Sequence, residues 1–193
     1  MRTLLSSLAF PLIATAFLAA GCDEGTDSPD TEAPEFEADQ GQEAEPQETY
    51  GEGPYGIEKG SVVANYKFVG FPQPHQDKTS AFYVELADFY NPTGNEVYPE
   101  GSPYGAGNPK PKALLVTVSS VWCGPCNYES DVILPAEFAE YGPQGAQFLL
   151  QLADGPSVGE PAVFSDLVKW TNKYETLWPA VIDPSSKLAA LFE

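Results

Sequence analysis

Positive charge is scarce in this sequence. Nine of its 193 residues are lysine or arginine, against 28 aspartates and glutamates, and the formal net charge is −19. Proteins that bind nucleic acid neutralise phosphates with clustered lysine and arginine side chains. We therefore expect no nucleic-acid partner. Histidine is also scarce, and the single one, His75, stands in a proline-rich turn segment. We interpret it as an exposed bystander.

Long hydrophobic runs are also few. The apolar segment Leu8–Ala20 follows Arg2 and is short of the roughly 20 residues that span a bilayer. It has the proportions of a signal peptide's apolar region. The segment ends in Leu-Ala-Ala-Gly-Cys at residues 18–22, which resembles the lipobox of bacterial lipoproteins. This resemblance implies a lipoprotein signal peptide over 1–21 and a lipid anchor on Cys22. The alternative is an ordinary signal peptide that is cleaved near Ala20.

Acidic residues are concentrated after Cys22. The segment 22–50 contains many aspartates and glutamates, no lysine or arginine and few large apolar side chains. Such a segment buries too little apolar surface to offset the entropy lost on ordering. We predict a disordered tether over 22–50, followed by a folded domain over 51–193.

Residues 51–193 alternate between strand-like and helix-like patterns. Strands are expected at 62–69, 113–119, 146–152 and 180–183, and the segment 81–90 should be a strand that runs into a short helix or turn. Helices are expected after residue 126, at 164–171 and from Ser185 to Phe192. The apolar run 113–119 is typical of a central strand that is covered on both faces. The helix after residue 126 should end by Gly142-Pro143 and kink at Pro135. This alternation predicts an α/β domain with a largely parallel centre.

Cysteine is rare, and two of the three cysteines form a close pair. Cys123 and Cys126 follow the apolar strand directly and stand at the predicted start of a helix. Two thiols at this spacing form a small disulfide ring, and the helix N-terminus favours the thiolate of the first. In such sites the thiol pKa falls to about 7. We predict that Cys123 is the nucleophile and Cys126 the resolving cysteine.

The motif around the pair carries a second resemblance. Trp122-Cys123-Gly124-Pro125-Cys126 after an apolar strand resembles the active site of the thioredoxin superfamily, and its setting resembles the redoxin and TlpA-like thiol–disulfide reductases. The resemblance implies a thioredoxin-like fold, with a central mixed sheet and flanking helices. It also implies a reductant, because the Gly-Pro pair occurs in thioredoxin at about −270 mV, against about −120 mV for the oxidant DsbA.

The same resemblance implies partners and a location. Protein thiols and disulfides would be the substrates, and a membrane protein would donate electrons. The anchored domain would face the periplasm in the cell envelope.

Two further positions bear on the mechanism. Thioredoxins often keep a buried acid about six residues before the first cysteine, where this chain has Thr117. Glu129, three residues after the second cysteine, occupies a position where the TlpA-like reductases commonly carry glutamate. We predict that Glu129 is a proton shuttle for Cys126. The alternative is that Glu129 is a solvated helix residue. Trp122 is predicted to shield the disulfide.

Other chemistries for the pair find no support in the sequence. Haem attachment requires histidine directly after the second cysteine, where Asn127 stands, and a zinc site requires two more ligands. Copper delivery and peroxidase chemistry require other cysteine contexts. We predict no metal and no cofactor. The competing hypothesis for function is a non-catalytic, lipid-anchored binding module in which the disulfide is structural.

One part of the family pattern is absent before the last residue. Thioredoxin-like sites include a cis-proline that begins an antiparallel hairpin, and the candidate here is Pro179 after Trp178. The short segment that follows does not fit that hairpin. We therefore predict a domain truncated before the cis-proline hairpin, with Phe192 and a sheet edge exposed.

Overall fold

The computed structural model describes residues 50–191. The predicted signal peptide, Cys22, the acidic segment up to residue 49, and Phe192 with Glu193 lie outside the described residues. Among the helices of residues 50–191, none has the length and apolar character needed to span a membrane.

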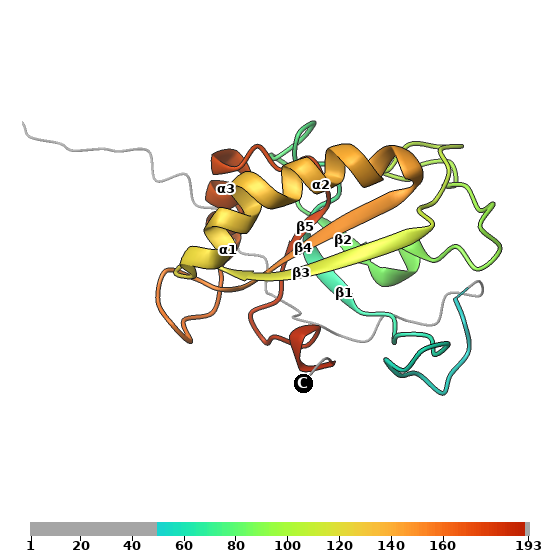
Figure 1. The fold of residues 1–193 in the computed structure, drawn as a ribbon, viewed down its shortest axis with the longest axis horizontal. Helices are drawn as coiled ribbons and strands as arrows, with labels where there is room; N and C mark the ends of the chain where they lie inside the picture. Colours follow the sequence, from blue (N-terminus) through green and yellow to red (C-terminus); the bar gives the residue numbers. More distant parts are fainter. Residues whose placement is uncertain (1–49, 192–193) are drawn as a thin grey trace, which may run out of the picture. The chain divides into compact units, whose positions relative to one another are not determined.

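The core of the domain is a mixed five-stranded sheet in the order β2-β1-β5-β4-β3 (Figure 1). Strands β3, β4 and β5 are parallel to one another, whereas β1 is antiparallel to both β5 and β2. The strands are β1 (Lys67–Phe71), β2 (Phe82–Glu85), β3 (Ala113–Ser120), β4 (Ala146–Asp154) and β5 (Ala180–Ile182).

Helices connect the strands and flank the sheet. The connection from β3 to β4 is a continuous helical path across the sheet in Figure 1, made of α1 (Gly124–Tyr128), the π-helical segment η2 (Glu129–Ile133) and α2 (Leu134–Tyr141). The other helices are α3 (Phe164–Lys173) and the short 3-10 segments η1 (Leu86–Phe89), η3 (Gly142–Gln144) and η4 (Ala189–Leu191). These elements confirm the predicted α/β class and the mixed sheet with flanking helices.

The predicted irregularity at Pro135 takes the form of a π turn. In the segment η2, which directly precedes Pro135, the N–H of Leu134 bonds to the carbonyl of Glu129, five residues back. Proline has no N–H to give to the helix ladder, and π-helical structure inside α-helices occurs mostly as single turns of this kind. The helix ends at Tyr141, before Gly142-Pro143, as the sequence predicts.

The sheet separates two apolar clusters. On one face, Phe148, Leu150 and Leu152 of β4 pack with Trp170 of α3 and with Trp178. On the other face, side chains of β4, β1, η1 and the loop after it pack together: Leu149, Phe68, Leu86, Phe89, Tyr98 and Tyr104. Because successive side chains of a strand point to opposite faces, β4 contributes to both clusters and is buried along most of its length.

The predicted place of β3 is wrong. Among the described residues β3 pairs only with β4, so it is an edge strand, and Leu115 and Val118 are 43% and 39% exposed. The strand that is covered on both faces is β4. The apolar composition of β3 indicates a buried environment, but burial also depends on a second neighbouring strand.

Two other expectations need correction. The first strand begins at Lys67 rather than at residue 62, because residues 63–65 pair with no neighbouring strand. The Oδ1 of Asn65 in this segment accepts from the N–H of Ala87 at 2.9 Å. The expected final helix from Ser185 is reduced to η4, because Ser186 has a positive φ of 52° that a regular helix cannot include. The Trp178–Pro179 peptide bond is trans.

The carboxyl group of Asp88 makes the stability of the domain depend on pH. It is largely buried, burial raises its pKa above the usual value, and its Oδ2 accepts from the N–H of Glu85 at 3.0 Å and from the hydroxyl of Tyr104 at 3.3 Å. An acid whose pKa is higher in the folded state binds protons more tightly when folded. Its contribution therefore becomes less favourable as the pH rises from the unfolded pKa through the folded pKa.

We expect the Asp88→Asn variant to show how much of the pH dependence of stability comes from Asp88 and how much from the other carboxylates. The melting temperature of the variant relative to the wild type should increase from pH 3 to pH 7, because only the wild type acquires the buried charge. Calorimetry of both proteins across this range measures the difference. A difference that stays constant with pH would show that Asp88 titrates as it does in the unfolded chain.

Candidate active site

The cysteine pair lies where β3 ends. The N–H of Cys123 donates to the carbonyl of Ser120 at 3.0 Å, so the chain turns sharply after the strand. Cys123 is the N-cap of α1, with extended backbone angles, and Pro125 lies in the first turn. Proline is favoured there because the first N–H groups of a helix have no partner within the helix. Strand, turn and capping residue thus bring the pair to the carboxyl edge of the parallel strands.

The two cysteines are joined in a disulfide, with Sγ atoms 2.07 Å apart and Cα atoms 5.3 Å apart. Both are partly buried, and Cys126 packs against the α-helical side of the core. The backbone N–H of Cys126 donates to Sγ of Cys123 at 3.2 Å. In the dithiol form, a backbone donor at this place stabilises a thiolate on Cys123.

Trp122, directly before the pair, is largely exposed and is held in place by Asp154. Its indole Nε1 donates to Oδ2 of Asp154 at 3.0 Å, and the N–H of Val121 donates to the backbone carbonyl of the same residue at 3.0 Å. The N–H of Gly159 also approaches Oδ2, at 3.4 Å. Asp154 is the last residue of β4, so the neighbouring strand fixes the tryptophan that precedes the reactive cysteine.

We expect Asp154→Ala to release Trp122. The indole loses its acceptor, so Trp122 becomes more accessible, while Trp170 and Trp178 stay buried at 3% and 2% exposure. Acrylamide quenching of tryptophan fluorescence should increase, and stability should fall by about 1 kcal/mol, the usual value of one hydrogen bond. Asp131→Ala, which removes an exposed carboxylate on η2, is the control. Equal quenching in the two variants would contradict the anchoring role.

Three buried hydroxyl groups lie on β3, before the pair, and on η2, after it. Thr117 pairs with Leu150 in the β3–β4 register, and Ser119 pairs with Leu152, so both point to the face on which Cys126 packs. Both are buried, as is Ser130 of η2, and their hydroxyl oxygens have no hydrogen-bond partner within residues 50–191. The place where thioredoxins often keep a buried acid thus carries a hydroxyl here.

The side chains of Glu129 and His75 make few interactions with other described residues. The side chain of Glu129 is partly buried and makes no hydrogen bond or ion pair with another residue of the described chain. His75 is exposed, and its Nε2 lies 3.3 Å from Nε2 of Gln76. Over residues 50–191 no group of histidine, cysteine or acidic side chains is arranged to hold a metal ion.

Asn127 has a role at the pair that the sequence analysis missed. Its Nδ2 donates to the carbonyl of Val121 at 3.1 Å and to the carbonyl of Cys123 at 2.7 Å. Its Oδ1 accepts from Nζ of Lys173 at 3.1 Å and from the hydroxyl of Tyr174. The sequence signal is an amide directly after the motif. Nothing in the sequence indicates its partners, which lie 46 and 47 residues further along the chain.

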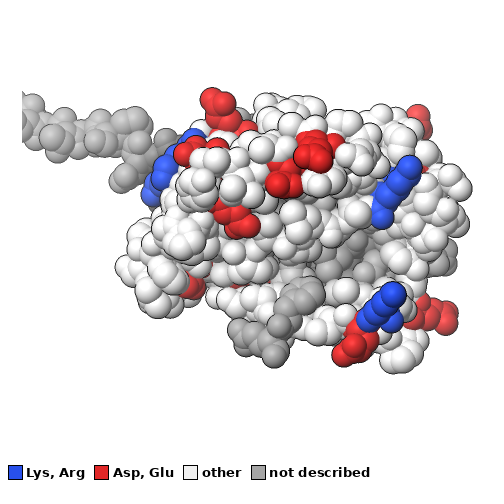
Figure 2. Space-filling view, in the orientation of Figure 1, with Lys and Arg blue, Asp and Glu red and all other residues white. Residues whose placement is uncertain are grey.

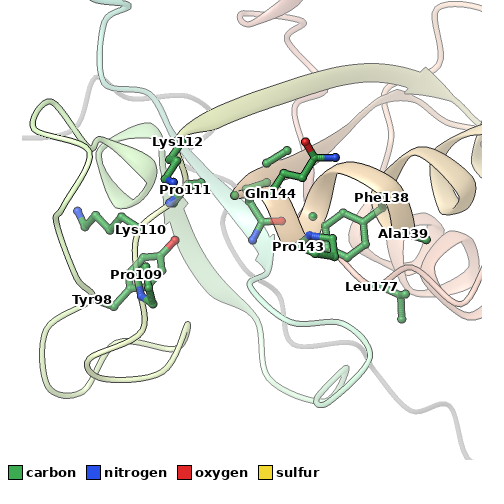
Figure 3. Close-up of a pocket in the computed structure, with 14 residues that line it drawn as sticks. Tyr98, Pro109, Lys110, Pro111, Lys112, Phe138, Ala139, Pro143, Gln144 and Leu177 are labelled. Carbon is green, nitrogen blue, oxygen red and sulfur yellow. The ribbon is translucent and has the colours of Figure 1, made fainter.

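A cleft of about 770 Å³ lies at the other end of the parallel strands. Figure 3 shows one wall formed by Tyr98 and the segment 109–112, and the opposite wall by α2, the following turn and Leu177. The ammonium group of Lys110 points away from the opposite wall and donates to the carbonyl of Ala87 at 3.3 Å. This cleft is separate from the cysteines, because the segments 109–112 and 142–145 that line it lead into β3 and β4, whereas the cysteines follow the end of β3.

Charged side chains are dispersed over the face drawn in Figure 2. Aspartates and glutamates occur singly or in small groups, with isolated lysines between them, and this face has no broad basic patch.

Comparison with known proteins gives one distant structural likeness to report. No protein-family model matches the chain, and no curated protein does. A solved structure described as a thiol:disulfide interchange protein DsbE from Chlorobium tepidum is similar, with a TM-score of 0.40 and 21% sequence identity. The similar region covers 65% of this chain and 64% of the solved one. This chain therefore spans less than two thirds of the length of the solved protein. The thioredoxin-like α/β fold is therefore assigned from the topology of the chain itself: a βαβ unit in a mixed sheet, with a disulfide at the helix start.

Proposed function

We propose that this protein is an extracytoplasmic thiol–disulfide oxidoreductase that acts as a reductant through Cys123 and Cys126. The observation that carries the proposal is the disulfide at the start of α1, with the backbone N–H of Cys126 directed at Sγ of Cys123. Of the two cysteines, Cys126 packs against the core. Cys123 is therefore the sulfur that meets a substrate, and Cys126 the one that resolves the mixed disulfide.

The proposed reaction transfers two electrons from the dithiol to a substrate disulfide. The Cys123 thiolate attacks one substrate sulfur, a mixed disulfide forms, and the first substrate sulfur leaves as a thiolate that takes up a proton. Cys126 then loses its proton and attacks Sγ of Cys123. This step closes the Cys123–Cys126 disulfide and releases the second substrate thiol. A membrane dithiol protein of the cell envelope restores the reduced form by the reverse exchange.

The location in the proposal comes from the N-terminal sequence. The apolar segment that ends in Gly21-Cys22 supports export and lipidation, and the acidic segment after it supports a tether between membrane and domain. Labelling of expressing cells with a radioactive or clickable fatty acid tests the anchor. We expect label on the wild type and none on Cys22→Ala.

The direction of the reaction is measured by the reduction potential. Equilibration of the purified protein in glutathione buffers, with the cysteines trapped by a maleimide, should give a value near that of thioredoxin, about −270 mV. A value above about −180 mV, the range of protein disulfide isomerase, would contradict a reductant. Turbidity of insulin with dithiothreitol tests activity directly. A wild-type rate equal to dithiothreitol alone would favour the binding module with a structural disulfide.

Proton transfer to and from Cys126 is assigned in this proposal to Glu129, one helical turn further along. Glu129 is the first carboxylate after Cys126 along the helix. The buried hydroxyls of Thr117 and Ser119 are too weakly basic to take up the proton. We expect Glu129→Gln to slow insulin reduction at neutral pH and to change its pH profile. An unchanged pH profile would remove Glu129 from the mechanism.

A further inference from the structure

The carboxamide of Asn127 connects the reactive turn to α3. On one side, Nδ2 bridges the carbonyls of Val121 and Cys123, which flank Trp122. The carbonyl of Cys123 also accepts the backbone N–H of Asn127 at 3.0 Å. One residue thus makes two hydrogen bonds to the backbone of the nucleophilic cysteine and a third to the residue two positions before it.

The other side of the same amide receives the last turn of α3. Nζ of Lys173 donates to Oδ1 at 3.1 Å, and the buried Tyr174 donates its hydroxyl to the same atom. Lys173 also lies 4.7 Å from the centre of the Tyr174 ring. A cation bound to Oδ1 polarises the amide and strengthens the hydrogen bonds that Nδ2 donates. The two sides of Asn127 are therefore coupled.

We propose that Asn127 is a positioning residue for thiol–disulfide exchange, which holds Cys123 at the helix start and makes its reactivity depend on Lys173 at the end of α3 and on Tyr174 directly after it. The inference rests on the proposed function of the pair. Only a carboxamide of this length satisfies both sides, because the two carbonyls require donors and the α3 groups require an acceptor. Aspartate has the same shape but offers no donor to the carbonyls.

Other charged groups near the pair act from different positions. Glu129 stands on the same helix, Asp154 at the end of β4 binds Trp122, and Lys173 is the charged group that reaches Asn127 from α3. Neither Glu129 nor Asp154 makes a hydrogen bond with Asn127. A change that follows from Asn127 is therefore separable from changes at Glu129 and Asp154.

The test is the rate at which reduced Cys123 is alkylated by iodoacetamide between pH 5.5 and pH 9, resolved by mass spectrometry. For Asn127→Ala we expect a rate at pH 6.5 about 3–10 times lower than the wild type, with the midpoint of the pH profile moved upward, because the thiolate loses its ordered backbone donor. Asn127→Asp should lower it further. Lys173→Met should lower the rate in part, and Lys173→Arg should restore it.

Asn172→Ala is the matched control. Asn172 stands on α3 next to Lys173 and accepts from Lys78 at 2.9 Å, away from the reactive turn, so its profile should equal the wild type. Unchanged alkylation in both Asn127 variants would overturn the proposal. If Asn127→Ala does not fold, Lys173→Met and Tyr174→Phe carry the test, and an unchanged profile in both would also overturn it.

Failure of the proposed function gives a different result from failure of the positioning role. If wild-type protein does not reduce insulin while Asn127→Ala still alters alkylation, the positioning role stands and the oxidoreductase does not. If insulin is reduced at equal rates and equal pH profiles by the wild type and Asn127→Ala, the oxidoreductase stands and the positioning role does not.

Discussion

Replacement of Cys123 by serine is expected to lower the rate of insulin reduction more than about a hundredfold, to that of dithiothreitol alone, because a hydroxyl cannot replace a thiolate as nucleophile. The loss should be complete at every pH at which the wild type is active. The rate of insulin precipitation at 650 nm measures it.

Cys126→Ser provides the contrast. Cys123 remains free to attack in this variant, but nothing resolves the product, so a mixed disulfide with the substrate should accumulate. The adduct is visible on a non-reducing gel and absent from Cys123→Ser. If the disulfide is structural, both variants should instead lose stability alike, and neither should trap a substrate. Adducts formed mainly by Cys123→Ser would reverse the assigned roles of the two cysteines.

Replacement of Gly70 by alanine is expected to cost about 3 kcal/mol of folding free energy, the upper part of the usual range for overpacking. Gly70 lies in β1 opposite Val181 of β5. A Cβ built there would lie 2.1 Å from the carbonyl oxygen of Ala180 and 2.7 Å from Cα of Val181. Both are backbone atoms, so no side chain can move aside and the strands must separate. Urea denaturation followed by circular dichroism measures the loss.

Gly56→Ala is the control for the previous substitution. A Cβ at Gly56 meets its nearest neighbour, Oγ of Ser61, at 3.4 Å, an ordinary contact. Its effect should stay within about 0.5 kcal/mol, as for most surface substitutions. An equal urea midpoint for Gly70→Ala and Gly56→Ala would contradict the close approach of β1 and β5.

The pattern of the sequence predicted most elements, because local signals are strong there. The apolar run before the motif predicted β3, and Gly142-Pro143 marked the end of the helix that follows. Prediction was weaker at the ends of the domain. The first strand starts late because residues 63–65 have no neighbouring strand, and the last helix is shortened by the positive φ of Ser186. Side-chain patterns reveal neither.

The position of each strand in the sheet was not predictable from composition. β3 and β4 are both apolar, yet β4 lies between two strands and β3 has one neighbour among the described residues. Apolar side chains favour burial on either strand, and the order of strands depends on pairings between distant segments. The predicted central place of β3 was wrong for this reason.

The sequence by itself determined that a cysteine pair stands at a helix start, since the spacing of Cys123 and Cys126 and the turn before them depend on neighbouring residues alone. Only the tertiary structure decided what surrounds the pair. Asp154 reaches Trp122 from another strand, and Lys173 and Tyr174 reach Asn127 from another helix. Such contacts join residues far apart in the chain, and packing of the helices on the sheet brings them within hydrogen-bond distance.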